Sequence, residues 1–214
     1  SNKIMVIEQK LTNPHRSKQL EIFYDKDHPE MSQYYDLLDK KLSKAAFLRE
    51  MRNLIQKNPD FYDPYLVVAN ILKDDGKEKE ARNILYTAYE RAIKRIVDKE
   101  GNFPKELHWG WLENRHLIRT IQAWAFELWE QDKPEEALEI FRKLLHSNPG
   151  DNIGARHSIL AILMKLKANY EDKFASENAP GYLDGFKLCK WFDDNSKKFP
   201  EEFGWWEEAV KRLH

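Results

Sequence analysis

Residues 121–149 read IQAWAFELWEQDKPEEALEIFRKLLHSNP, and their apolar residues recur at the spacing of an α-helix. The first apolar stripe holds Ile121, Trp124, Ala125, Leu128 and Trp129, and the second holds Ala137, Leu138, Phe141, Leu144 and Leu145. Residues 131–133 suit a turn between the two stripes, and Pro134 suits the first position of a helix. The stretch therefore predicts two helices joined by a tight turn.

The same pattern occurs over residues 65–88, at a constant offset of 56 positions. Tyr65, Val68, Ala69 and Leu72 correspond to Ile121, Trp124, Ala125 and Leu128, and Gly76, Ala81, Leu85 and Ala88 correspond to Asp132, Ala137, Phe141 and Leu144. Two helices approach closely only where a small side chain lies at the crossing and large neighbours fill the groove. A hairpin of this kind leaves an apolar face uncovered, so it needs a neighbour on each side. The pattern predicts an all-α protein of stacked antiparallel helical hairpins, with the alanines buried at the crossings.

These residues resemble the tetratricopeptide repeat (TPR) family, whose pattern places large, small, large, small and large residues before a closing proline. The second unit matches best, and the residues that carry the match are Trp124, Ala125, Leu128, Ala137, Phe141 and Pro149. The TPR period is ~34 residues, so an offset of 56 implies an insertion of ~22 residues between the two units. Residues 109–115 and 148–156 also resemble a group of TPR-like proteins related to the suppression-of-tumorigenicity family, which implies no known chemistry. The resemblance implies a short right-handed solenoid.

We expect one domain over residues 1–214. It comprises a weakly patterned segment at 1–30, a degenerate repeat at 31–59, a repeat at 60–98, an insertion at 99–117, a repeat at 118–150, and C-terminal helices and a cap at 151–214. Ile4, Ile7 and Leu11 predict a short first helix. Ser43 and Asp63 are expected to cap the helices that follow them.

Composition narrows the class of protein. Lys and Arg (35) nearly balance Asp and Glu (36), so no overall charge attracts the chain to nucleic acid or to a membrane surface. One cysteine excludes an intrachain disulfide and fits a reducing compartment. The chain has no apolar run near the ~20 residues of a membrane span and no apolar stretch of useful length in its first ten residues, so we expect a cytoplasmic protein. No nucleotide-binding glycine loop is present, and we expect no cofactor.

In the TPR family the first helix of each pair lines a concave face that binds a peptide. Carried over to this chain, the resemblance implies a peptide-binding face formed by Asn70, Lys73, Arg119, Gln122, Phe126, Trp129 and Arg156. Asn70 stands where some family members grip a peptide's C-terminal carboxylate, but Leu66 replaces the lysine of that clamp. The leading hypothesis is a scaffold or adaptor for a protein or peptide partner. An incomplete array can also pair with itself, so a homodimer remains open.

A hydrolase or transferase is the alternative, with a site at His108, Glu113 and His116 beside the unusual Trp109–Gly110–Trp111 stretch. No pair of histidines has metal-binding spacing on a helix, so we expect structural histidines and no metal. Cys189 is expected to be a buried thiol because nothing near it in sequence would activate a nucleophile. The tryptophans are expected to pack in the core, with Trp129 and Trp205 the most exposed. We therefore predict no catalytic residue.

Overall fold

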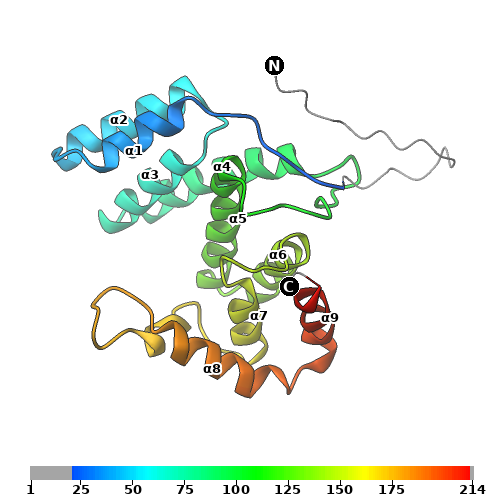
Figure 1. The fold of residues 1–214 in the computed structure, drawn as a ribbon. Coiled ribbons are helices and arrows are strands. Elements are labelled where there is room, and N and C mark those ends of the chain that lie inside the picture. The colour runs from blue at the N-terminus through cyan, green and yellow to red at the C-terminus, as the bar shows by residue number, and fades with distance from the viewer. Residues whose placement is uncertain (1–20, 213–214) are drawn as a thin grey trace, which may run out of the picture.

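The computed structural model describes residues 21–212, and over this range the chain is all-α (Figure 1). Its helices are α1 (Glu30–Leu38), α2 (Lys44–Lys57), α3 (Asp63–Asp74), α4 (Glu78–Ile96), α5 (Leu112–Glu130), α6 (Pro134–Ser147), α7 (Ala155–Leu163), η1 (Tyr170–Phe174), α8 (Gly185–Ser196) and α9 (Pro200–Lys211). Two isolated β-bridges, Ile22–Glu106 and Ala175–Leu183, are the only strand-like pairings in these residues. The predicted all-α class is confirmed. The helix expected from Ile4 to Leu11 lies outside the described residues.

From α1 to α8 the helices pack in chain order. The described contacts join α1 to α2, α2 to α3, α3 to α4, α4 to α5, α5 to α6, α6 to α7, and α7 to α8. In addition, α3 contacts α5 directly, so these two helices share a surface although α4 separates them in the sequence. None of the described helices is long and apolar enough to span a lipid bilayer.

The alanines of the repeat pattern are buried, as predicted. Ala125 and Ala137 have no exposed surface, and Ala69 and Ala81 are almost fully covered. Val68 and Leu72 of α3 pack in a cluster with α1 and α2, whereas Tyr65 of the same helix belongs to the larger core around α5. The α3–α4 pair is thus covered on two sides, which the hydrophobic pattern requires.

Three helices end in the same left-handed turn. Gly76, Asp132 and Lys165 follow α3, α5 and α7, with φ of 72°, 62° and 58°. The residue after each of these donates its backbone N–H to a carbonyl of the preceding helix. The bonds run from Lys77 to Leu72 (2.8 Å), from Lys133 to Leu128 (3.0 Å) and from Leu166 to Ala161 (2.9 Å). This bond between residues five apart satisfies a carbonyl that the helix end would leave free. The offset of 56 between the first two turns is therefore visible in the backbone.

Predicted helix boundaries differ from the structure at three places. Ser43 caps α2 through a bond from the Ala46 N–H (3.3 Å), as expected, but Asp63 forms no cap. Residues 112–117, expected within the insertion, form the first turns of α5, because Leu117 is buried and continues the apolar stripe. The 3-10 helix η1 was not predicted.

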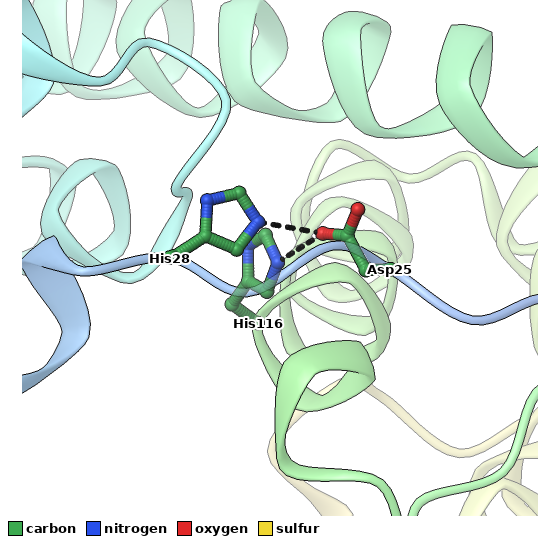
Figure 2. A group of neighbouring side chains, drawn as sticks. All are labelled: Asp25, His28 and His116. Carbon is green, nitrogen blue, oxygen red and sulfur yellow. Dashed lines mark hydrogen bonds and ion pairs between the residues drawn. The ribbon is translucent and has the colours of Figure 1, made fainter. Parts of the chain in front are cut away.

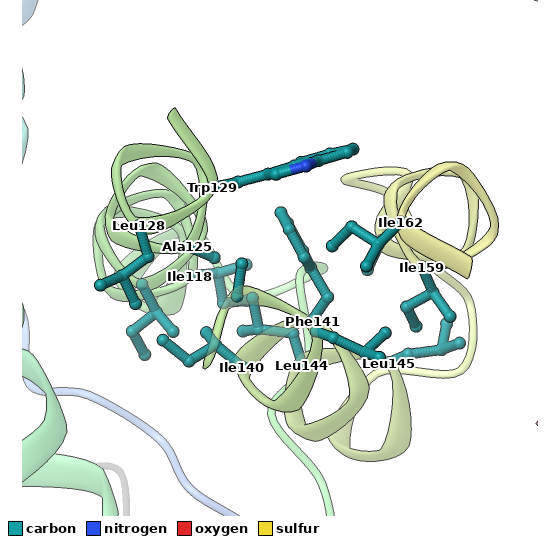
Figure 3. Packing of buried hydrophobic residues seen from close by; sticks show 14 of the residues in the cluster. Ile118, Ala125, Leu128, Trp129, Ile140, Phe141, Leu144, Leu145, Ile159 and Ile162 are labelled. Atoms are coloured by element: carbon teal, nitrogen blue, oxygen red, sulfur yellow. The ribbon is translucent and has the colours of Figure 1, made fainter. Parts of the chain in front are cut away.

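Burial of the tryptophans and of the cysteine also differs from the prediction. Figure 3 shows Trp129 of α5 above Phe141 of α6 and Ile162 of α7, and its exposed fraction is 6%. Tyr170 of η1 stacks on the indole of Trp129, with ring centroids 5.7 Å apart. The exposure predicted for Trp129 is therefore wrong. The burial predicted for Cys189 is also wrong, because α8 turns Leu188 toward the core and leaves the thiol exposed.

Candidate functional site

The segment before α1 crosses the molecule and meets the beginning of α5 (Figure 1). The N–H of Phe23 donates to the carbonyl of Glu106 (3.0 Å), and the N–H of Asp25 donates to the side-chain oxygen of Asn114 on α5 (2.9 Å). Asn114 in turn donates to the carbonyl of Phe23 (3.0 Å). These bonds hold residues 23–25 against α5 and place the Asp25 carboxylate inside the protein.

Asp25, His28 and His116 form a buried cluster, which Figure 2 shows from close by. The Nε2 atoms of His28 and His116 each lie 2.8 Å from the same carboxylate oxygen, Oδ2 of Asp25. All three side chains have no exposed surface. The second carboxylate oxygen pairs with the guanidinium of Arg95 on α4. The cluster therefore joins the N-terminal segment, α4 and α5 at one point.

The hydrogen-bond partners determine where the histidine protons lie. Nδ1 of His116 receives the backbone N–H of Tyr62 (3.0 Å), so it must be unprotonated and Nε2 must carry the proton. Nδ1 of His28 receives the side-chain amide of Asn58 (3.0 Å). The orientation of that amide follows from two further bonds, from the Asp60 N–H to its oxygen (3.1 Å) and from its nitrogen to Glu30 (2.8 Å). Both rings are thus neutral donors to Asp25.

The charges of the cluster are consistent with this assignment. Burial would raise the pKa of Asp25, but the hydrogen bonds from His116 and His28 and the nearby Arg95 outweigh it and hold this pKa well below its usual range. Burial lowers the pKa of His116 more than the bond to Asp25 raises it. The Asp25 carboxylate thus has a partner at both oxygens, one guanidinium and two neutral imidazoles, whereas Nε of Arg95 is buried without a hydrogen-bond partner.

Two histidines and a carboxylate are also a ligand set for zinc or iron. A metal-bound histidine uses an unprotonated nitrogen and normally donates its other N–H to an acceptor. In both histidines Nδ1, the nitrogen that does not contact Asp25, accepts a hydrogen bond, from Asn58 in His28 and from the Tyr62 N–H in His116. Neither Nδ1 therefore carries a proton to donate. A metal bound at Nε2 would leave His116 without a proton on either nitrogen. The residues therefore do not fit a metal, and the arrangement favours an anchor built from hydrogen bonds.

The structure separates the residues of the alternative enzyme site. His116 is buried in the cluster, whereas the side chain of His108 is 44% exposed and pairs with Glu106 (2.7 Å). Glu113 shares no hydrogen bond or ion pair with either histidine in the described part of the chain. A general base must lie within hydrogen-bond reach of its substrate, and no substrate reaches a fully buried ring. No described hydrogen bond or ion pair joins the three residues of the predicted trio.

The residues predicted to bind a peptide lie on α3, α5 and α7, and most are engaged within the protein. Arg119 holds Asp63 through two bonds (2.9 and 2.5 Å), and Lys73 pairs with Glu130. Gln122 donates to the carbonyl of Ile153 (2.8 Å).

The remaining four differ in exposure. Phe126 is half-buried against Phe141, and Trp129 is buried. Arg156 pairs with Asp151 (2.7 Å). Asn70 is exposed, and its side chain forms no hydrogen bond within residues 21–212.

The sequence predicts structural histidines at positions 28 and 116, with His116 also in the alternative enzyme site, and it assigns no role to Asp25. Asp25 and His116 are 91 positions apart. Asp25 lies on an irregular segment, and no sequence spacing predicts which helix residue such a segment contacts. Comparison with protein-family models, with curated proteins and with solved structures finds no match. The TPR resemblance therefore remains a prediction.

Proposed function

We propose that this chain is a protein-interaction scaffold that holds a segment of a partner protein on the surface shared by α3 and α5. The observation that carries the proposal is the direct contact between these two helices, which are the first helices of successive pairs. In a repeat protein such helices lie side by side and present one continuous face. We name this surface the α3–α5 face and define it by Asn70, Lys73, Arg119, Gln122 and Phe126.

The helix pairs are proposed to stack as a short TPR-like solenoid. The left-handed turns after α5 and α7, at Asp132 and Lys165, are 33 positions apart, close to the ~34 of the family. The larger interval between Gly76 and Asp132 contains the long connection from α4 to α5. The burial of Ala69, Ala81, Ala125 and Ala137 supports the same arrangement. Its right-handed sense comes from the family resemblance.

Paired charges lie near both ends of the α3–α5 face. Asp63 and Arg119 form one pair, and Lys73 and Glu130 form the other. A charge that already has a partner contributes little to binding a new one. Between the pairs lie exposed Asn70 and the half-buried Phe126. A bound segment would therefore gain free energy from amide hydrogen bonds and apolar contact at the centre.

A phage-displayed library of random short peptides tests the proposal. Gln122 and Phe126 are unsuitable positions for substitution, because one bonds to Ile153 and the other packs on Phe141. Asn70→Arg places a long charged side chain at the exposed centre of the face without removing a described contact. We expect the parent protein to enrich peptides that Asn70→Arg fails to enrich.

Asn83→Arg is the matched control, because it makes the same substitution at an exposed position of α4. This control should enrich the parental peptides. Equal enrichment by Asn70→Arg, or none by the parent, would refute binding on this face. If sedimentation shows a dimer that Asn70→Arg dissociates, the bound segment belongs to a second copy of the chain.

A further inference from the structure

Arg115 of α5 is a cation that is held in place but has no acidic partner. Its Nε donates to the carbonyl of Trp109 (2.9 Å), and its guanidinium lies over the Trp109 ring, 5.1 Å from the centroid. Arg115 forms no ion pair within residues 21–212. Its two terminal nitrogens form no hydrogen bond in this range, and they are not buried. Because the residue is half-buried, these two nitrogens face solvent.

Arg119, one turn further along α5, shows what such a group binds. It lies over the same indole at 5.7 Å, and its guanidinium holds the carboxylate of Asp63 through two bonds. A guanidinium presents a planar fork that matches a carboxylate, and stacking together with a bond at Nε reduces the freedom it loses on binding. Arg115 has the same support from Trp109 and an unused fork.

Apolar side chains are exposed beside Arg115. Leu112 lies three residues earlier on the same face of α5, and its exposed fraction is 54%. Trp111 and Tyr24, with exposed fractions of 50% and 46%, contact each other with ring centroids 4.3 Å apart. Aromatic rings close to an arginine are typical of the centres of protein interfaces. We call Tyr24, Trp111, Leu112 and Arg115 the terminal patch.

We infer that the terminal patch binds an acidic peptide segment in which an Asp or Glu side chain lies next to an apolar residue. This inference rests on the proposed scaffold function and adds a second contact for the same bound segment, because Arg115 lies one turn before Arg119 of the α3–α5 face and both lie over the Trp109 ring. The carboxylate takes the fork of Arg115, and the apolar residue packs on Leu112 and Trp111. A nucleic acid fits less well, because binding a phosphate backbone takes several cations. Glu113 on the same turn of α5 carries the opposite charge, and Arg119 is already paired with Asp63.

The peptide library also tests this inference, with Arg115→Gln and the control Arg52→Gln. Arg52 is an exposed arginine on α2, so its replacement removes the same charge elsewhere. The parent and Arg52→Gln should enrich peptides in which Asp or Glu stands next to an aliphatic or aromatic residue. Arg115→Gln should lose the acidic preference, and synthetic copies of the enriched peptides should bind it ~10-fold more weakly or worse.

Leu112→Ser is a second test variant, because Arg115→Gln removes the bond to Trp109 and can alter the loop there. It should lose the apolar preference, keep the acidic one and melt at the parental temperature. If the parent enriches only peptides without acidic residues, or if Arg115→Gln keeps the acidic preference, this inference fails, and the scaffold proposal stands as long as Asn70→Arg loses the enriched peptides. If the parent enriches no peptide, both fail.

Discussion

Replacing His116 by phenylalanine tests the buried cluster, because the ring remains and both hydrogen bonds are lost. The Tyr62 N–H loses its acceptor, at a cost of about 1–3 kcal/mol, and Asp25 loses one bond to a charged group, at about 1.5–3 kcal/mol. The more apolar ring returns part of this free energy. We expect His116→Phe to lower the free energy of unfolding by about 3 kcal/mol near neutral pH.

The pH dependence of this difference has a definite sign. Burial lowers the pKa of folded His116 below 6.5, the ordinary value that the unfolded chain retains. The stabilisation is fully present above pH 6.5 and declines as the pH falls toward the folded pKa, because the unfolded state binds the proton first. The decline is at most ~1.4 kcal/mol per pH unit. The gap between the parent and His116→Phe should therefore narrow on acidification.

Urea unfolding of both proteins at about pH 7.5 and about pH 5 measures the effect. The comparison cancels titrating groups outside the cluster, including His157, whose pKa burial lowers to about 3, and Asp151, whose pKa burial raises to about 6. His108→Phe is the control, since the His108 side chain is 44% exposed and lies outside the cluster, and it should change stability by less than about 0.5 kcal/mol. A gap below about 1 kcal/mol at the higher pH, or one that widens with acid, would contradict the proton assignment.

Two further substitutions test the packing and the turns. Ala125→Phe should lower stability by about 1–3 kcal/mol or more in thermal melts, because Ala125 has no exposed surface, whereas Ala45→Phe on the exposed part of α2 should have little effect. Gly76→Ala should cost about 1 kcal/mol although a Cβ there meets nothing within 4 Å, because φ of 72° disfavours side chains. Asp132→Gly, at the equivalent turn, should stabilise the protein by a few tenths of a kcal/mol. Chemical denaturation measures both changes. Stabilisation by Gly76→Ala together with destabilisation by Asp132→Gly would refute the shared turn geometry.

Local chemistry in the sequence was sufficient to predict the all-α class and the burial of the alanines. Helical spacing of apolar residues depends on neighbours three and four positions away, and the Ser43 cap and the Gly76 turn involve residues within one helical end. The burial of Ala69 and Ala125 follows from the same short-range pattern repeated at a fixed offset. These features need no knowledge of distant segments.

Tertiary contacts alone decided what the short-range pattern leaves open. Asp63 pairs with Arg119 on α5 instead of capping its own helix, and Trp129 is covered by Tyr170 of η1. His116 acquires its role from Asp25, which an irregular segment carries to it from 91 positions away. Irregular segments follow no periodicity, so the sequence does not indicate which side chains they bring together. The physical reason is that the helices arise from local backbone geometry, whereas the buried charges depend on long-range packing.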